Sequence, residues 1–259
     1  MTNASFKDEV TILPGSFGLT GVKLSRLFPC APNGRHVLLL HGVHSSANLS
    51  PRNKFRHLAI LLAQRGMTPW LCETSRKVAN HDAYIDDIPR WIEDAFRGKN
   101  FQNEFDDCAA ALEHVLQARP ASLWIWGFSL GGITALALAC RAVAPVPDKV
   151  IVSGTGLISL PHIENTMMDL PILSTLRETI NAEMLDGLKA REAVSFRGAN
   201  DHVFSEAACR DLLAKLPLPN ENKRFYTIEG ADHSLKTRNG KHDPKIMDEM
   251  LSLLCQDEA

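Results

Sequence analysis

The sequence predicts an α/β fold, with a mostly parallel sheet and helices on both of its faces. Short apolar runs alternate with longer amphipathic runs along the chain, which is the pattern of parallel strands joined by crossover helices. The chain has 259 residues, of which 45% are hydrophobic and 22% charged, an ordinary profile for a globular protein with a sizeable core. Because no internal repeat or low-complexity segment interrupts it, we expect a single domain over residues 1–259.

The apolar runs predict the strands, and the amphipathic runs predict the helices. Expected strands are, in chain order, residues 9–13, 21–28, 36–40, 68–72, 123–126, 149–152, 193–196 and 224–228. Expected helices are residues 55–64, 101–118, 132–143, 206–215 and 244–254. Turn and breaker residues set several limits: Pro14-Gly15 separates the first two strands, Gly66 closes the first helix, and Pro120 ends the second. In that second helix, apolar residues from Phe101 to Leu116 recur at helical spacing.

Two stretches do not fit a simple crossover between strands. Residues 155–191 contain an amphipathic segment, with Leu173 and Met184 among the residues on its apolar face, and residues 74–100 are polar and mixed. Either stretch is a candidate for a small cap over the site, and 155–191 is favoured because of its length and its place before the seventh strand. An ordinary crossover helix that only covers the sheet is an equal alternative. In the second stretch, Trp91 is a candidate for lining an entrance.

The pentapeptide at residues 127–131, Gly-Phe-Ser-Leu-Gly, joins the fifth expected strand to an apolar helix. G-x-S-x-G at a strand-to-helix turn is the pattern of a nucleophile elbow. Glycines are needed on both sides of the serine, because larger side chains would clash in so tight a turn. The turn lifts the Ser129 hydroxyl out of the sheet and leaves the Leu130 amide at a helix N-terminus, where it can bind a developing oxyanion. We therefore predict that Ser129 is a nucleophile.

A serine nucleophile needs an imidazole to take its proton and a carboxylate to orient that imidazole. Asp201 follows the seventh expected strand, and His233 follows the eighth. Functional residues of parallel sheets gather at the carboxyl ends of the strands, so both side chains are expected beside Ser129. We predict that Asp201 is the acid and His233 the base. The other histidines considered for the base are His202 and His242.

The third expected strand runs directly into His41-Gly42-Val43-His44. In this position the amide of Val43 is the expected second oxyanion donor, and Gly42 lets the backbone approach the substrate closely. His41 is expected to orient the loop through hydrogen bonds. Together with Phe128, which precedes the nucleophile, His41, Gly42 and His44 are the candidate substrate-binding residues. Simple exposure of His44 to solvent stays an alternative.

In kind and order these pieces resemble the α/β-hydrolase fold family. They are His41-Gly42, Gly127-x-Ser129-x-Gly131-Gly132, Gly198-x-x-Asp201 and Gly230-x-x-His233. One G-x-S-x-G arises readily by chance, whereas four pieces in order, each after an expected strand, are specific. The resemblance covers most of the chain. It implies a mostly parallel eight-stranded sheet, no metal or organic cofactor, and hydrolysis through an acyl-enzyme.

We therefore interpret the chain as a serine hydrolase that cleaves a carboxylic ester of a small to medium substrate. A thioester, an amide or a lactone stays open as the substrate, because the tetrahedral chemistry is the same. The alternative from another class is a binding protein on a hydrolase scaffold that has lost catalysis. The locally basic stretch at residues 52–57 indicates either a solvated helix start or contact with an anionic substrate.

Composition excludes several other functions. The formal net charge of −2 gives no basic footprint for nucleic acid. Residues 1–9 lack the apolar core of a signal peptide, and no stretch approaches a membrane-spanning length, so we expect a cytoplasmic protein without a membrane partner. The six cysteines are scattered, and we expect them to be reduced core residues rather than disulfides or metal ligands. The oligomeric state is not indicated.

Overall fold

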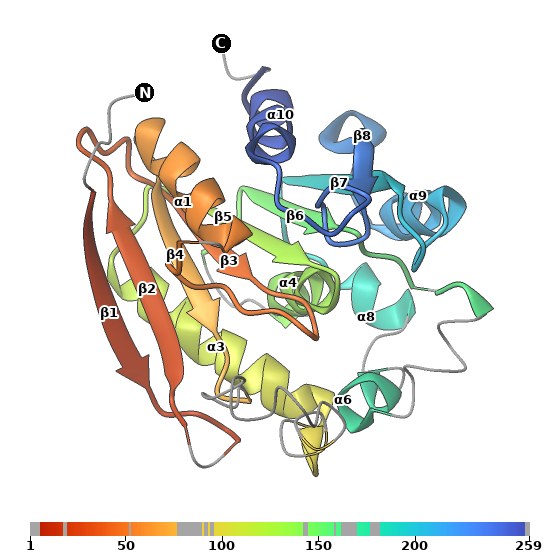
Figure 1. Ribbon diagram of the computed structural model, residues 1–259, viewed down its shortest axis with the longest axis horizontal. Helices are drawn as coiled ribbons and strands as arrows, with labels where there is room; N and C mark the ends of the chain where they lie inside the picture. The colour runs from red at the N-terminus through yellow and green to blue at the C-terminus, as the bar shows by residue number, and fades with distance from the viewer. Residues whose placement is uncertain are drawn as a thin grey trace.

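Eight strands form one sheet in the computed structural model, which describes residues 6–17, 20–51, 53–76, 90, 93, 96–141, 145–157, 159–161, 170–176 and 182–256. The strands are β1 (Lys7–Leu13), β2 (Val22–Phe28), β3 (Arg35–Leu40), β4 (Thr68–Glu73), β5 (Ser122–Phe128), β6 (Lys149–Ser153), β7 (Glu192–Asn200) and β8 (Lys223–Asp232). Their spatial order is β1-β2-β4-β3-β5-β6-β7-β8, as Figure 1 shows. Only the pairs β1–β2 and β2–β4 are antiparallel. The predicted mostly parallel, eight-stranded sheet is confirmed.

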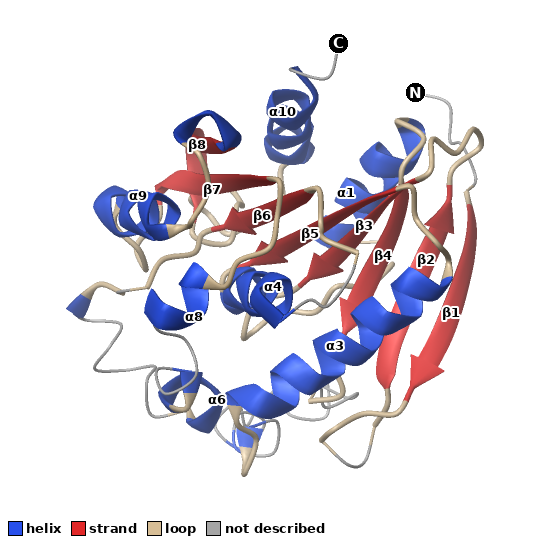
Figure 2. Ribbon diagram, turned by 180° about the vertical axis from the view of Figure 1, so that it is seen from behind, coloured by secondary structure: helices blue, strands red, loops and turns tan. Residues whose placement is uncertain are grey.

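Helices cover both faces of the sheet, as predicted. On one face lie α1 (Lys54–Gln64) and α10 (Pro244–Cys255), which stand in front of the sheet in Figure 1. On the other face, seen from behind in Figure 2, lie α3 (Phe101–Gln117), α4 (Leu130–Arg141), α8 (Ala182–Asp186) and α9 (Glu206–Lys215). Two short helical turns, α6 (Pro171–Ser174) and η2 (Asn220–Asn222), complete the described elements. Within this described part, no helix combines the length and the apolar character that crossing a membrane requires.

The strand β3 shows why the sheet needs a helix layer on each side. Leu38 and Leu40 belong to the apolar cluster under α3 and α4, whereas Val37 and Leu39 belong to the cluster under α1 and α10. Successive side chains of a strand point to opposite faces, so a strand that is apolar at every position must be covered twice. This is why the continuous apolar runs of the sequence predicted the parallel strands.

The parallel strands β3, β5, β6, β7 and β8 end at the same edge of the sheet. In the register of the sheet, Leu40 pairs with Gly127, and Phe128 pairs with Ser153. On the far side of the sheet, Asn200 pairs with Asp232. The residues that follow these strand ends therefore lie near one another, although His41 after β3 and His233 after β8 are 192 positions apart in the chain.

The last two strands are longer than predicted. β7 and β8 each continue four residues beyond the predicted ends, 196 and 228, and an irregularity in their pairing lies between Gly198 and Asn200. The sequence prediction ended both strands early and placed Gly198 and Gly230 in the loops that follow. Gly198 instead lets the two strands approach closely, since a Cβ there would overlap the backbone oxygen of Asp232.

The predicted cap at residues 155–191 is only partly described. Leu185 and Leu188 are buried in the main apolar cluster, as expected for a segment that covers the sheet. Leu173 and Leu176 pack on the same cluster and also line a cavity. The cap limits stay a prediction, since 158, 162–169 and 177–181 lie outside the described residues. The same holds for most of the second candidate stretch, 77–89, and for Trp91.

None of the six cysteines, all of which lie in the described part of the chain, forms a disulfide. Three of them are buried core residues, as predicted, namely Cys72, Cys108 and Cys209. Cys30, by contrast, is exposed, so the interpretation as small core residues does not hold for every cysteine.

The turn between β5 and α4 leads to a test of stability. A Cβ on Gly127 would overlap the backbone of Gly131 and Gly132, and backbone atoms cannot move aside as a flexible side chain can. We expect Gly127→Ala to lower the free energy of unfolding by about 3 kcal/mol or more, measured by urea denaturation. Gly240→Ala is the matched control: its backbone has φ +70°, but its Cβ would meet no atom of the described residues within 4 Å, so we expect a loss of about 1 kcal/mol. Equal losses in both variants would contradict the steric argument.

Candidate active site

Ser129 lies in the turn between β5 and α4 with a backbone φ of +54°. This left-handed conformation is unfavourable for a serine, so the surroundings must hold it. The Ser129 N–H donates to the carbonyl of Ser153 (2.8 Å), and the Ser129 carbonyl accepts from the N–H of Gly132 (2.8 Å). The hydroxyl of Thr155 also donates to that carbonyl (3.2 Å). The strained turn predicted from the sequence is therefore present and fixed from both sides.

The structure brings Ser129, His233 and Asp201 together. The Oγ of Ser129 lies 3.0 Å from Nε2 of His233. The other ring nitrogen of His233, Nδ1, lies 3.1 Å from both carboxylate oxygens of Asp201. With Nδ1–H donating to the carboxylate, Nε2 is left as an acceptor for the serine hydroxyl. This is the hydroxyl–imidazole–carboxylate sequence that proton transfer from a serine requires.

Asp201 is held as a carboxylate in a buried position. Its side chain is fully buried, and its Oδ1 accepts from the backbone amides of Val203 (2.8 Å) and Phe204 (3.0 Å). Burial acts to raise the pKa of Asp201, but the hydrogen bond and charge of His233 and the two amides outweigh it, so the net pKa lies below its usual value. The group is thus charged wherever a neutral histidine can act as a base.

Gly154, which the sequence did not single out, leaves the space that His233 occupies. Gly154 follows β6 with φ +58°, and a Cβ there would lie 2.6 Å from the backbone oxygen of His233 and 3.3 Å from its Nδ1. Any side chain at this position would displace the ring from Asp201. The available signal was a glycine directly after an apolar strand, at the same edge of the sheet as Ser129.

The loop after β3 lies directly against the nucleophile. A Cβ on Gly42 would be 3.2 Å from both the Phe128 carbonyl oxygen and the Ser129 Cβ, so only glycine fits comfortably. The Gly42 N–H donates to the hydroxyl of Ser45 (3.0 Å) and its carbonyl accepts from the Ser45 N–H (3.2 Å). On the other side of Ser129, Leu130 is the first residue of α4, where N–H groups have no acceptor within the helix.

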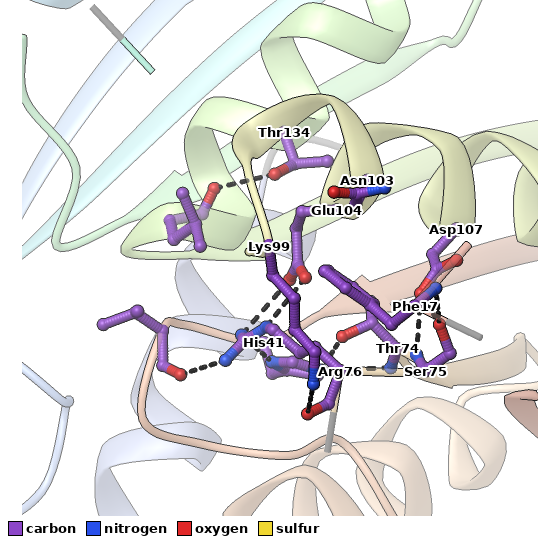
Figure 3. A network of polar contacts seen from close by, with 12 residues as sticks. Phe17, His41, Thr74, Ser75, Arg76, Lys99, Asn103, Glu104, Asp107 and Thr134 are labelled. Carbon is purple, nitrogen blue, oxygen red and sulfur yellow. Dashed lines mark hydrogen bonds and ion pairs between the residues drawn. The ribbon is translucent and has the colours of Figure 1, made fainter. Parts of the chain in front are cut away.

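A buried arginine, Arg76, binds this loop, and Figure 3 shows it among polar contacts with His41 and Glu104. Its Nη2 donates to the carbonyl of Gly42 (2.9 Å), and its Nη1 donates to the carbonyl of Val43. Its Nε and Nη2 pair with the buried carboxylate of Glu104 on α3, at 2.7 and 3.2 Å. Three residues further along α3, Asp107 accepts from both the amide (2.7 Å) and the hydroxyl (2.6 Å) of Ser75. Two carboxylates on one face of α3 therefore fix the segment after β4.

The hydrogen bond from Arg76 to the Gly42 carbonyl sets the direction of the Val43 amide. The Gly42 carbonyl and the Val43 N–H belong to one peptide group, and in a trans peptide they point in opposite directions. Because Arg76 binds the carbonyl, the Val43 N–H is turned to the side away from Arg76. This matters because the Val43 amide is the predicted second oxyanion donor.

His41 belongs to the same network rather than to the substrate cavity. It is 2% exposed, with Nδ1 3.1 Å from Nη2 of Arg76 and Nε2 3.3 Å from the N–H of Thr74. It is not among the described residues that line the cavity. The prediction of His41 as a substrate-binding residue is therefore corrected, because the ring is covered by the loop it orients. The hydrogen-bonding role expected from the sequence agrees with these contacts.

Ser129 opens onto a cavity of about 530 Å³. The three other predicted substrate-binding residues, Gly42, His44 and Phe128, line it, as do Val43 and Leu130. His44 is also exposed, so both readings considered for it agree with the structure. The apolar residues that line the cavity include Phe128, Phe55, Ile133, Leu173 and Leu176.

The rival histidines do not reach the nucleophile. The His202 ring lies 6.2 Å from the ring of His233 and lines the cavity, and the His242 ring packs 5.4 Å from that of His57. Neither contacts the Ser129 hydroxyl in the described structure. Nor do the described residues contain a group of three or more histidines, cysteines or carboxylates that could hold a metal ion.

The chain is similar to known proteins in both sequence and structure. The sequence profile of the alpha/beta hydrolase fold matches residues 35–246. A soluble variant of monoglyceride lipase from Saccharomyces cerevisiae aligns with a TM-score of 0.70 and 15% identity, covering 99% of this chain and 96% of that chain. Dienelactone hydrolase from Anabaena variabilis aligns with a TM-score of 0.63 and 19% identity, covering 97% of this chain and 96% of that chain. XC6422 from Xanthomonas campestris, a serine hydrolase without a lid, aligns with a TM-score of 0.63 and 15% identity, covering 95% of this chain and 92% of that chain. No curated protein sequence matches the chain.

The buried pair Arg76–Glu104 leads to a prediction on stability. In Arg76→Met the Glu104 carboxylate stays buried without its partner, which costs about 3–5 kcal/mol. We expect urea denaturation to show a loss of this size, and the double variant Arg76→Met/Glu104→Leu to recover most of it.

The control is the exposed pair Arg210–Glu206, whose side chains are 56% and 46% exposed. Arg210→Met is expected to change the free energy of unfolding by no more than about 0.5 kcal/mol. If Arg76→Met costs no more than Arg210→Met, the pair does not anchor the loop.

Proposed function

Because this chain belongs to the alpha/beta hydrolase fold family, we propose that it is a serine hydrolase that cleaves a carboxylic ester through an acyl-enzyme. The single observation that carries the proposal is the contact series from Ser129 Oγ through His233 to Asp201. Hydrolases of the same fold with lipase and dienelactone hydrolase names align over nearly the whole chain, which supports an ester as the substrate. Their low identity leaves the particular ester open.

In the first half of the proposed reaction, Ser129 becomes acylated. His233 Nε2 takes the proton of the Ser129 hydroxyl as Oγ attacks the carbonyl carbon, and a tetrahedral oxyanion forms. The resulting imidazolium is stabilised by the buried carboxylate of Asp201. His233 then gives the proton to the leaving alcohol, the C–O bond breaks, and an ester of Ser129 remains.

In the second half, water takes the place of the alcohol. His233 removes a proton from a water molecule, which attacks the acyl carbonyl. Collapse of the second tetrahedral intermediate returns the proton to Ser129 and releases the carboxylic acid. Both intermediates carry the negative charge on the same oxygen. We propose that this oxygen accepts hydrogen bonds from the backbone amides of Leu130 and Val43.

The role of these amides follows from electrostatics. Donors that are fixed before the reaction stabilise a developing charge without reorganising, and one such donor contributes about 10²–10³-fold to kcat in a serine hydrolase. The Leu130 amide is fixed by α4, and the Val43 amide by the contact of Arg76 with the Gly42 carbonyl. Arg76 is thus a positioning residue in this proposal.

Other acyl substrates use the same steps. A thioester, an amide or a lactone would differ only in the leaving group, and a lactone would keep its alcohol on the acid product. The alternative of a binding protein without catalysis is less compatible with the site, because a strained Ser129 and a fully buried Asp201 would be kept without a use.

Replacement of the nucleophile tests the proposal directly. We expect the protein to hydrolyse 4-nitrophenyl butyrate and Ser129→Ala to lose at least about 10³-fold in kcat/KM, since water alone then attacks the ester. Ser252→Ala, on the exposed side of α10, is the matched control and is expected to retain full activity. Turnover in Ser129→Ala equal to that of the wild type would refute the assignment.

A fluorophosphonate probe separates an enzyme from a binding protein. An activated Ser129 is expected to be labelled stoichiometrically, as measured by intact-mass spectrometry, and labelling is expected to vanish in Ser129→Ala. A folded wild-type protein that stays unlabelled would favour the binding protein.

The carboxylate of the triad, Asp201, is tested against Asp232, the carboxylate that directly precedes His233 in the sequence. We expect Asp201→Asn to lower kcat by about 10⁴-fold, because the amide cannot stabilise the imidazolium or fix the correct tautomer. Asp232→Asn is the control: Asp232 accepts from the Lys236 amide (2.9 Å) in a turn and does not face the ring in this way. A comparable loss in both variants would show that the effect is structural.

A further inference from the structure

The cavity that contains the Ser129 hydroxyl has an uneven charge. Two lysines, Lys54 and Lys236, line it, and none of the described lining residues is an aspartate or a glutamate. The remaining polar lining consists of serines, histidines and one asparagine. A substrate cavity with positive groups and no described carboxylate favours an anionic ligand.

Lys54 is unusual because it is buried. It is the first residue of α1, held there by the Asn53 cap, and only 8% of its surface is exposed. Its Nζ lies 4.4 Å from the centre of the Phe128 ring and 5.2 Å from that of Phe55, and it donates to the carbonyl of Ser234. An ammonium has three N–H donors, and that carbonyl accepts only one of them.

No carboxylate in the described part of the chain lies within ion-pair distance of this ammonium. Burial, together with the charge of Lys236, lowers the pKa of Lys54 to about 7, and the charge of Asp232 opposes this shift. The pKa of His242 is also lowered, first by burial and then by the charges of His57 and Lys54. A buried cation without a counter-charge is costly, and an anion that entered the cavity would relieve this cost.

Part of the lining of the same cavity is apolar. It is formed by Leu130 and Ile133 of α4, with Leu173 and Leu176 from the segment before β7. A ligand that contacts both the lysines and these apolar residues has an aliphatic part and a charged end. Ser129 lines the same cavity, so the proposed nucleophile and the two lysines belong to one binding space.

We propose that the ester cleaved at Ser129 carries an anionic group, a carboxylate or a phosphate, which binds at Lys54 and Lys236. The inference rests on the proposed function and narrows it to substrates with an acidic substituent. Lys54 supplies a buried, oriented charge, and Lys236, which is half-buried, supplies a second charge nearer to the solvent. In this role Lys54 also explains why a basic residue stands at the start of α1, where a solvated helix face was the alternative.

The first test compares ester pairs that differ in one charge. The carboxylate arm uses mono-4-nitrophenyl adipate against methyl 4-nitrophenyl adipate, and the phosphate arm uses 4-nitrophenyl 5-phosphonopentanoate against its dimethyl ester. We expect kcat/KM to be at least about ten-fold higher for the anionic member of one pair, and the arm with the larger ratio identifies the group. Ratios at or below one in both arms would overturn the proposal.

Variants of the lysines locate the effect. We expect Lys54→Met to bring the preferred ratio close to one, Lys54→Arg to keep most of it, and Lys236→Met to reduce it by a smaller factor. Lys215→Met, on the exposed side of α9, changes the net charge equally and is expected to leave the ratio unchanged. A ratio that survives in both Lys54→Met and Lys236→Met would overturn the assignment, and Lys236→Met keeps the test open if Lys54→Met does not fold.

Binding is measured separately from turnover. Calorimetry with hexanoate and with pentylphosphonate is expected to give tighter binding to the wild type than to Lys54→Met, and Ser129→Ala is expected to bind as the wild type does. If no ester is hydrolysed but these anions bind through Lys54, the proposed function fails and the anion site stands. If esters are hydrolysed and neither anion binds, the anion site fails and the proposed function stands.

Discussion

The conformation of Ser129 is the constraint on which the site depends. A serine at φ +54° persists only because the carbonyl of Ser153 and the N–H of Gly132 bind its peptide groups. Those partners exist only when β5 lies beside β6 and α4 starts at once, which requires glycine at 127 and 131. The two helix layers then follow, because strands that are apolar on both faces must be covered on both. The turn, the order of the strands and the two helix layers therefore depend on one another.

Most of this fold could be predicted from the sequence, since its signals are local. Continuous apolar runs identified the parallel strands, and helices such as α9 were predicted with their exact limits. The ends of β7 and β8 were missed, because Gly198 was interpreted from local preference, whereas its role is a close approach to Asp232 on the neighbouring strand. Local reasoning fails where a distant residue sets the conformation.

The same distinction applies to the site. Ser129, Asp201 and His233 could be singled out, because each follows a predicted strand in a recognisable order. Arg76 and Glu104 were not, although a signal was present: Glu104 and Asp107 lie on the apolar face of α3, where charged residues are rarely found without a reason. What the sequence could not supply was the partner, since Glu104 meets Arg76 only after α3 packs beside β4. Lys54 was seen as part of a basic stretch, but its burial could be known only from the folded structure.

The contact of Arg76 with the loop after β3 has a consequence for how such a protein can diversify. One of the two amides that would stabilise the transition state, that of Val43, is anchored through Arg76 to Glu104 on α3, and α3 contributes no described lining residue to the cavity. The walls that would select the substrate come from α1, from α4 and from the segment before β7. Mutations in α1 or in the segment before β7 can therefore change which molecule is accepted while the anchor of the Val43 amide stays intact. Selection can act on specificity and on rate almost independently, which is one physical reason for the wide range of substrates found on a single scaffold.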